Sequence, residues 1–204
     1  MSHCTRFDFQ YTSRKMVCRS FQALGLKYED GNIAYFSSNL TKQLGIGGKN
    51  ETPAIIAERD GFHYFMENKG AYYELLIEKH NMTSADMETG KQMADEFKRT
   101  YIKEVAMDVV DKLNQQGNPA ILNETSSGYE IRFGHLYNKS ILIKFENGRV
   151  LEEVRGVKGQ SCVSLTEALE NMLSSPDIEL TTEWTEEYYE ADTETIKLYD
   201  LQDS

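Results

Sequence analysis

A long apolar stripe constrains the fold of this chain more than any other feature. Large apolar and aromatic side chains recur every four residues between residues 83 and 116, namely Met93, Phe97, Tyr101, Val105, Val109 and Leu113. This spacing places them on one face of an α-helix that ends at Gly117 and Pro119. Gly90 is expected to divide the segment into a short first helix and a long second one. Such a stripe has to be buried, and a sheet is the only large partner that the sequence offers.

Alternating apolar and polar residues predict that sheet. The alternation has the period of two that is typical of half-buried strands. It occurs in residues 5–11, 54–58, 62–67, 71–78, 120–124 and 129–135. Asp60-Gly61 is one of the turn sequences that separate these strands. Asp30-Gly31-Asn32 predicts a further tight hairpin between two short strands, and Ser13 predicts the N-cap of a helix over residues 13–25.

The pattern restarts at residue 139 with a compact hairpin and helix. Residues 140–146 and 149–155 flank Asn147-Gly148, the strongest two-residue hairpin signal. A glycine-rich turn follows, and then a short amphipathic helix from about residue 164 to 173. The sequence therefore predicts an α+β fold: an antiparallel sheet with helices packed on one face, plus a C-terminal ββα unit.

Charge is distributed unevenly along the chain. The net charge of the 204 residues is −11, and residues 176–204 hold ten acidic residues and one basic residue. We therefore expect an α+β main domain at 1–138, a hairpin-helix unit at 139–175 and an acidic tail at 176–204. The acidic tail repels phosphate backbones, which disfavours direct nucleic-acid binding and favours a protein partner.

No apolar run has the length of a membrane-spanning helix, and the N-terminus lacks the apolar stretch of a signal peptide. The three cysteines are widely spaced, which is typical of reduced thiols rather than of a disulfide framework. These features predict a cytoplasmic protein that does not enter a membrane. No motif indicates a cofactor, and the oligomeric state does not follow from the sequence.

Cys162 is the candidate catalytic residue. It follows the glycine-rich turn and lies at the start of the predicted helix, where backbone N–H groups and the helix dipole stabilise a thiolate. The same turn could instead hold an anion through Gly156, Lys158, Gly159 and Ser161. A small core residue is the alternative interpretation of Cys162, and no histidine near it in the sequence could act as its base.

Both ends of the chain carry further candidate residues. Trp184, Tyr188 and Tyr189 lie within the acidic tail and could bind a partner protein. At the other end, His3 and Cys4 could chelate a soft metal together with the α-amino group, although fraying is the more usual state of a terminus.

Two stretches resemble known families. Met1-Ser2-His3, Gly70-Ala71-Tyr72-Tyr73-Glu74-Leu75 and the long helix with Tyr101 resemble the conserved hypothetical chloroplast reading frame thirty-five family, over about residues 1–135. Residues 139–175 resemble a small bacterial family of unknown function with a hairpin, Gly-x-Lys-Gly-x-x-Cys and helix signature. Proteins of the second family are often encoded near the first family and near an AAA-type ATPase. The resemblance therefore implies joint action of two fused parts, and it supplies no reaction.

Taken together, these features predict a non-enzymatic interaction or adaptor protein, accessory to an AAA-type ATPase. The absence of a recognisable catalytic constellation, the acidic aromatic tail and the fusion all favour this hypothesis. Two alternatives stay open. One is a thiol-dependent enzyme or carrier that uses Cys162, and the other is an acidic decoy that inhibits a nucleic-acid-binding protein.

Overall fold

The computed structural model describes residues 3–32, 53–79, 81–146, 149–158 and 161–189. It forms an α+β fold with antiparallel sheets, as predicted from the sequence. The chain makes two compact units. The four-stranded unit comprises Tyr11–Ile102, and the six-stranded unit comprises Met1–Gln10 together with Lys103–Ser204.

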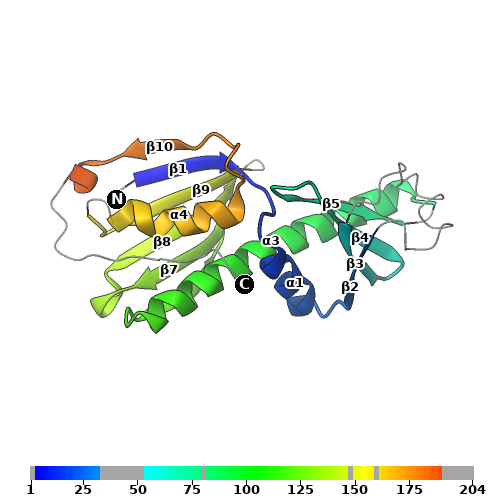
Figure 1. The fold of residues 1–204 in the computed structure, drawn as a ribbon, viewed down its shortest axis with the longest axis horizontal. Helices are drawn as coiled ribbons and strands as arrows, with labels where there is room; N and C mark the ends of the chain where they lie inside the picture. Colours follow the sequence, from blue (N-terminus) through cyan, green and yellow to red (C-terminus); the bar gives the residue numbers. More distant parts are fainter. Residues whose placement is uncertain (1–2, 33–52, 80, 147–148, 159–160, 190–204) are drawn as a thin grey trace. The chain divides into compact units, whose positions relative to one another are not determined.

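The four-stranded unit is an antiparallel sheet with helix α1 and residues 84–102 of helix α3 (Ser84–Gln115) against it (Figure 1). Its strand order is β2-β3-β4-β5. The elements are α1 (Arg14–Ala23), β2 (Tyr28–Asn32), β3 (Pro53–Arg59), β4 (Phe62–Asn68) and β5 (Tyr73–Glu78). The predicted strands over residues 54–78 and the predicted helix after Ser13 are therefore confirmed, and the Ser13 side chain accepts the N–H of Met16 as an N-cap.

Aromatic rings form the core of this unit. Phe21 of α1, Tyr64 of β4 and Phe97 of α3 are buried, with ring centroids 4.7 Å apart for Phe21 and Phe97. The Phe21 and Tyr64 rings meet edge to face at 6.0 Å. The buried Tyr101 hydroxyl accepts the backbone N–H groups of Thr12 and Ser13 at 3.1 and 2.9 Å. This contact fixes the start of α1 against the long helix.

The predicted hairpin at Asp30-Gly31-Asn32 is wrong. Strand β2 runs straight through these residues and pairs with β3, so that Asp30 lies opposite Ile55 and Gly31 lies opposite Ala54. Pairing with an apolar strand more than twenty residues later overrides the local turn preference of Asp-Gly. The second strand expected for that hairpin, at 33–36, lies outside the described residues.

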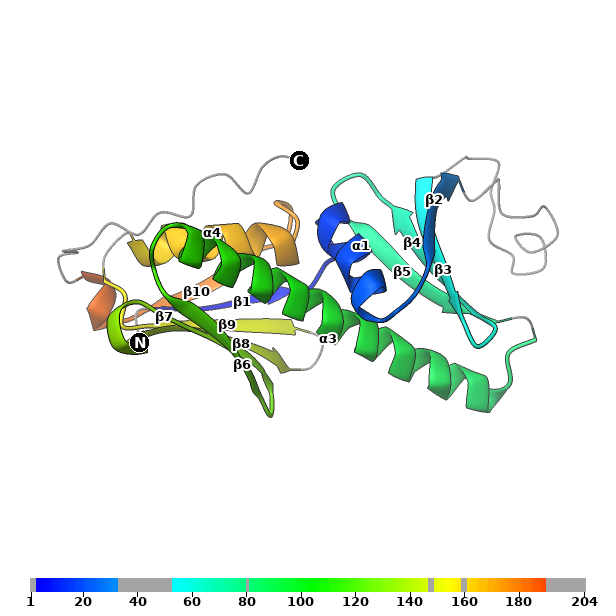
Figure 2. The same ribbon diagram turned by 90° about the horizontal axis from the view of Figure 1, so that it is seen from below.

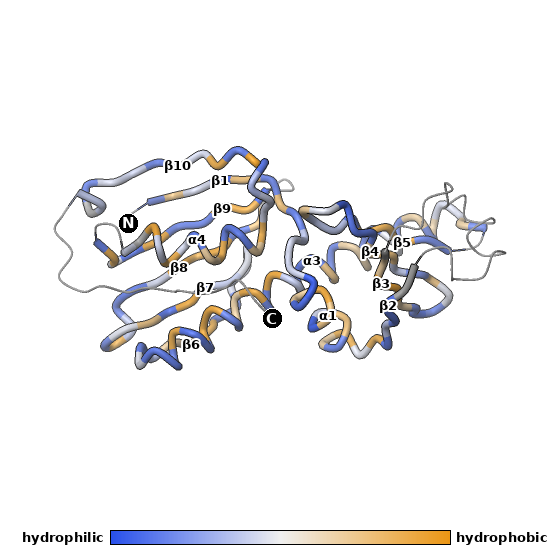
Figure 3. The backbone as a smooth tube through the Cα atoms, in the orientation of Figure 1, coloured by the Kyte–Doolittle hydropathy of each residue, from blue (hydrophilic) through white to orange (hydrophobic). Residues whose placement is uncertain are grey.

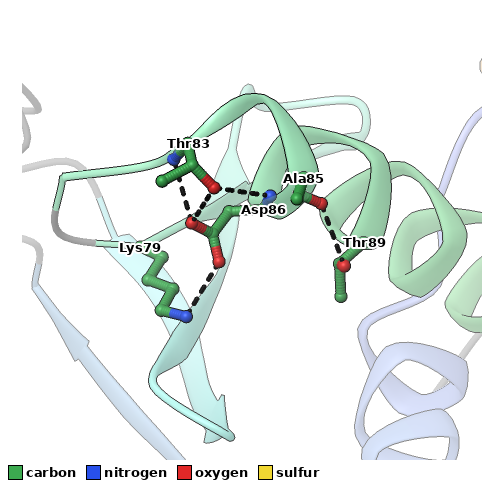
Figure 4. Close-up of polar contacts among 5 residues, drawn as sticks. All are labelled: Lys79, Thr83, Ala85, Asp86 and Thr89. Atoms are coloured by element: carbon green, nitrogen blue, oxygen red, sulfur yellow. Dashed lines mark hydrogen bonds and ion pairs between the residues drawn. The ribbon is translucent and has the colours of Figure 1, made fainter.

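Helix α3 (Ser84–Gln115) begins with a reciprocal cap (Figure 4). The Asp86 N–H donates to Thr83 Oγ1 at 3.2 Å, and the Thr83 N–H donates to Asp86 Oδ2 at 2.9 Å. Lys79 Nζ lies 2.8 Å from Asp86 Oδ1. These hydrogen bonds from Lys79 and Thr83 hold the pKa of the Asp86 carboxyl well below its ordinary value.

The predicted stripe of α3 is confirmed, because all six of its side chains are buried. The expected break at Gly90 is wrong, since the helix continues through it for 32 residues. Gly90 is buried, and a β-carbon there would lie 3.6 Å from the methyl group of Met82, so the glycine packs against a neighbouring side chain. Gly117 ends the helix with φ +79°, as predicted. Within the described part of the chain, no helix is long and apolar enough to cross a membrane.

The six-stranded unit is a single antiparallel sheet in the order β10-β1-β9-β8-β7-β6. The strands are β1 (His3–Asp8), β6 (Ala120–Thr125), β7 (Gly128–Phe133), β8 (Lys139–Glu146), β9 (Arg149–Arg155) and β10 (Thr181–Trp184). The predicted strands at 120–124, 129–135, 140–146 and 149–155 are confirmed. Strand β1 lies between β9 and β10, so a segment from the start of the chain completes a sheet built by its end.

Helix α4 (Ser161–Leu173) and residues 103–115 of α3 lie on the same face of this sheet (Figures 1 and 2). The tube of α4 and of the strands beneath it alternates between hydrophobic and hydrophilic colours, as a two-layer structure requires (Figure 3). Two short 3₁₀ helices, η2 (His135–Tyr137) and η3 (Glu186–Tyr189), complete the unit. The predicted ββα unit is present as β8, β9 and α4, in the middle of the sheet. The boundary predicted at 138/139 precedes β8 within that sheet, and the three-part division stays a prediction.

Candidate functional site

The aromatic residues expected to bind a partner lie at an edge of the six-stranded sheet. Trp184 ends β10, which pairs with β1 on one side. In the described residues no strand lies on the other side of β10. The Trp184 and Tyr188 rings are 4.2 Å apart, and those of Tyr188 and Tyr189 are 5.2 Å apart. Trp184 is 42% exposed and Tyr189 is 77% exposed, so the rings form an open cluster.

Acidic residues lie close to these rings in the sequence. Residues 176–189 contain no basic residue. We name the following exposed or half-buried residues the acidic aromatic edge: Asp177, Glu179, Leu180, Glu183, Trp184, Glu186, Tyr188 and Tyr189. Apolar rings, negative charge and an open strand therefore occur together at one place on the surface.

A second cluster lies on the inner face of the same sheet. His3 comes from β1, Glu152 from the adjacent β9, and Glu170 from α4, the helix that covers this face. Their ligand-type nitrogen and oxygen atoms all lie within 4.8 Å of one another. We name these three residues the buried His–Glu cluster.

Burial leaves several polar atoms of this cluster without partners. His3 is 1% exposed and Glu152 is fully buried. Among the described residues, His3 Nδ1 and both carboxylate oxygens of Glu152 have no hydrogen-bond partner. The other ring nitrogen, His3 Nε2, lies 3.4 Å from Thr166 Oγ1. Such orphaned polar atoms are rare in folded proteins and call for an explanation.

The pKa values of His3, Glu152 and Glu170 are all shifted, and burial is the main cause of each shift. Burial raises the pKa of the Glu152 carboxyl well above its ordinary value, and the nearby Glu170 adds to the rise. Burial also raises the pKa of Glu170 to about 7, against hydrogen bonds from Thr5 and Thr166. Burial lowers the pKa of His3 to about 4. All three shifts disfavour the charged forms, as expected where charge is taken out of water without compensation.

The sequence predicts His3 as a metal ligand together with Cys4 and the α-amino group, whereas the structure places it beside Glu152 and Glu170. The alternation of β1 places Cys4 on the opposite face from His3, where its thiol is half-buried. Burial and the Glu153 carboxylate raise the pKa of that thiol. Residues 1 and 2 lie outside the described residues, so a site formed by the terminal amine, His3 and Cys4 stays a prediction.

Glu152 and Glu170 were missed, although the sequence holds a signal for Glu152. Residues 150, 152 and 154 share one face of a strand, and the flanking Val150 and Val154 are apolar and buried. A carboxylate between two core positions breaks the binary pattern and marks a position of interest. Glu170 gives a weaker signal, because a half-buried carboxylate on an amphipathic helix is common.

The glycine-rich turn leads directly into α4. Gly156 has φ +72°, a conformation that favours glycine, Lys158 is exposed, and Ser161 is the buried first residue of the helix. Gly159 and the side chain of Cys162 lie outside the description. The backbone of Cys162 belongs to the first turn of α4, and the thiolate and anion hypotheses stay predictions.

The chain is therefore an α+β protein in which the six-stranded unit carries both the acidic aromatic edge and the buried His–Glu cluster. A family model matches residues 143–189, and the family is described as Protein of unknown function (DUF2997). The match covers less than a quarter of the chain and agrees with the predicted resemblance of this part to a small family of unknown function. No curated protein and no solved structure matches the chain significantly. Glu152, Glu170 and the aromatic residues lie inside the matched segment, and His3 lies outside it.

Proposed function

We propose that this chain is a non-enzymatic interaction protein whose acidic aromatic edge binds an extended, basic segment of a partner protein. The exposure of Trp184 and Tyr189 beside the open strand β10 is the observation that carries this proposal. Exposed tryptophan and tyrosine side chains are enriched among the residues that supply binding energy at interfaces. A strand edge offers backbone N–H and C=O groups to which an extended peptide can add as a further strand.

The charge of the edge supports a basic partner. Its acidic side chains have no basic neighbour within residues 176–189. Complementary charge increases the rate of association and rejects acidic competitors. Binding is therefore expected to weaken as salt screens the exposed charges.

The identity of the partner follows from the family resemblance rather than from the geometry. We propose that the chloroplast reading frame thirty-five part, at about residues 1–135, and the hairpin-helix part act together in one fused chain. The AAA-type ATPase that this resemblance implies is the partner to test first. A basic, extended segment of that ATPase is the chemistry that the edge would recognise.

The proposal is tested by fluorescence anisotropy with a labelled peptide of alternating lysine and valine residues. The full chain should bind it saturably, and binding should weaken as salt rises from about 50 to about 300 mM. Replacing both Trp184→Ala and Tyr189→Ala should weaken binding by about tenfold or more, because these rings are the exposed anchors. Point substitutions are preferable to deleting residues 176–204, since the deletion would also remove β10 from its pairing with β1.

A matched control is Tyr137→Ala, which removes another exposed tyrosine, 43% exposed, from η2 of the same unit. The control should bind like the unchanged chain. Equal binding by the double variant, or equal binding of a peptide with glutamate in place of lysine, would contradict the proposal.

The two alternative functions make different demands. An acidic decoy would show the same salt dependence, but duplex DNA would compete with it for a nucleic-acid-binding partner. A thiol-dependent enzyme or carrier would require a reactive Cys162, which iodoacetamide kinetics measure directly. Neither alternative uses the exposed rings of the acidic aromatic edge.

A further inference from the structure

We infer that His3, Glu152 and Glu170 form a binding site for one divalent first-row transition metal ion, of which Zn²⁺ is the representative. The residues come from β1, β9 and α4, and their candidate ligand atoms lie within 4.8 Å of one another. Bonds from Zn²⁺ to nitrogen and oxygen are about 2.0–2.2 Å long, so the ligand atoms of one ion lie within about 4 Å of each other. The candidate ligand atoms would have to approach one another by about 1 Å or less to share one ion.

The unpartnered atoms are independent support for a ligand. His3 Nδ1 and both oxygens of Glu152 are buried and have no hydrogen-bond partner among the described residues. A folded chain pays a penalty for each such atom, and the penalty is largest for a carboxylate. A cation at the centre of the cluster would satisfy these atoms together.

Among the residues that the structure describes, no positive charge lies beside Glu152 that could replace a metal ion. The charged neighbour that acts on Glu152 is another acid, Glu170. Facing the cluster from β1 and α4 are the hydroxyls of Thr5 and Thr166, and the Trp184 ring lies 5.3 Å from the His3 ring. In the described part of the chain, these contacts hold the ligands in place without neutralising them.

The donor set narrows the kind of ion. An imidazole nitrogen with two carboxylates suits Zn²⁺, Fe²⁺ and Mn²⁺, whereas Mg²⁺ and Ca²⁺ prefer oxygen ligands throughout. The contact of His3 Nε2 with Thr166 leaves Nδ1 free to face the ion. A hydroxyl on the second ring nitrogen is the kind of contact that orients metal-binding histidines.

The site is a composite of two parts of the chain. Glu152 and Glu170 lie in the segment matched by the family model, and His3 lies on the strand inserted between β9 and β10. The ligand set is complete only when β1 occupies that position. Metal binding and insertion of β1 therefore stabilise each other, since an ion that binds only the folded unit shifts the folding equilibrium toward it.

The test uses the full chain, freed of any affinity tag and treated with a chelator, and titrates it with Zn²⁺ alone. We expect saturable binding of one equivalent by calorimetry. A thermal unfolding midpoint should rise by roughly 5–10 °C at about a hundredfold excess of free Zn²⁺ over the dissociation constant. Mg²⁺ at the same concentration should give no comparable shift.

Variants separate a metal site from a merely structural cluster. Glu152→Gln replaces a carboxyl group without a counter-charge by a neutral amide of the same shape, so its metal-free midpoint should equal or exceed that of the unchanged chain. Its affinity for Zn²⁺ should fall by at least about 100-fold, since loss of an outer-shell partner alone costs about 10–100-fold. The controls His135→Gln and Glu124→Gln change exposed residues of the same unit and should bind Zn²⁺ normally.

A second readout does not depend on stability. Co²⁺ bound by a histidine and two carboxylates should give visible absorption with the unchanged chain, and Glu170→Gln should lose it. Absence of saturable Zn²⁺ binding, equal affinity in Glu152→Gln, or equal affinity for Mg²⁺ would each overturn the inference. The Trp184 ring lies 5.3 Å from the His3 ring, so Tyr189→Ala alone is the variant that changes the acidic aromatic edge without touching the metal ligands. With that variant the partner-binding test and the metal test can fail separately.

Discussion

At the scale of single residues, Glu152 and Tyr101 show two ways in which a polar group exists inside a core. Glu152 is fully buried and its carboxylate oxygens lack partners among the described residues. Tyr101 is also fully buried, but its hydroxyl is used by two backbone N–H groups. A buried carboxyl group without a partner is costly, whereas a buried hydroxyl that accepts two hydrogen bonds stabilises the fold.

The contacts of Tyr101 lead to a direct prediction. Tyr101→Phe keeps the ring but removes the acceptor of the Thr12 and Ser13 N–H groups at the start of α1. The free energy of unfolding should fall by about 1 kcal/mol or more, because two half-buried N–H donors lose their acceptor. Urea denaturation measures the change. Tyr189→Phe, at a side chain that is 77% exposed, is the control and should leave the stability unchanged.

At the scale of elements, a helix or strand can be predicted from its local pattern, but the strand with which it pairs cannot. The α3 stripe repeats every four residues, so its position and buried face follow from the sequence alone. The pairing of β2 with β3 and the insertion of β1 between β9 and β10 join distant segments. Local sequence patterns do not show which distant strand a segment pairs with. The Asp30-Gly31 sequence therefore predicts a turn where the structure has a strand, and the order of strands in the six-stranded sheet does not follow from the sequence.

Because a carboxylate forms part of the cap of α3, we expect the stability of the protein to depend on pH. Asp86 has a pKa below its ordinary value of 3.8, chiefly because of hydrogen bonds from Lys79 and Thr83. A depressed pKa contributes stability above the ordinary value and loses it as the pH falls through the lowered one. Asp86→Asn should therefore be less stable than the unchanged chain near neutral pH, and the difference should shrink below about pH 4.

Urea denaturation at a series of pH values checks this prediction. Glu88→Gln removes an exposed carboxylate from the same helix, outside the reciprocal cap, and serves as the control. A constant difference between Asp86→Asn and the unchanged chain at every pH would show that the carboxylate charge is not responsible.

At the scale of the whole chain, the candidate sites depend on tertiary structure to different degrees. Trp184, Tyr188 and Tyr189 could be proposed from the sequence because they are aromatic residues in an acidic segment. The buried His–Glu cluster could not, since its members are 149 and 18 residues apart along the chain and meet only through sheet pairing and helix packing. The order of strands brings His3 and Glu152 together, which the sequence alone does not reveal. In the described residues, the same order places β10 at the edge of the sheet.

The addition of a partner strand to the edge of the six-stranded sheet can be followed by hydrogen exchange at the backbone of β10. The amide exchange of Thr181–Trp184 is measured with and without the lysine-valine peptide, in the full chain. We expect bound peptide to slow exchange in β10, because a new strand would form hydrogen bonds with its open backbone groups. Unchanged exchange in β10 at saturating peptide, or protection confined to other strands, would contradict it.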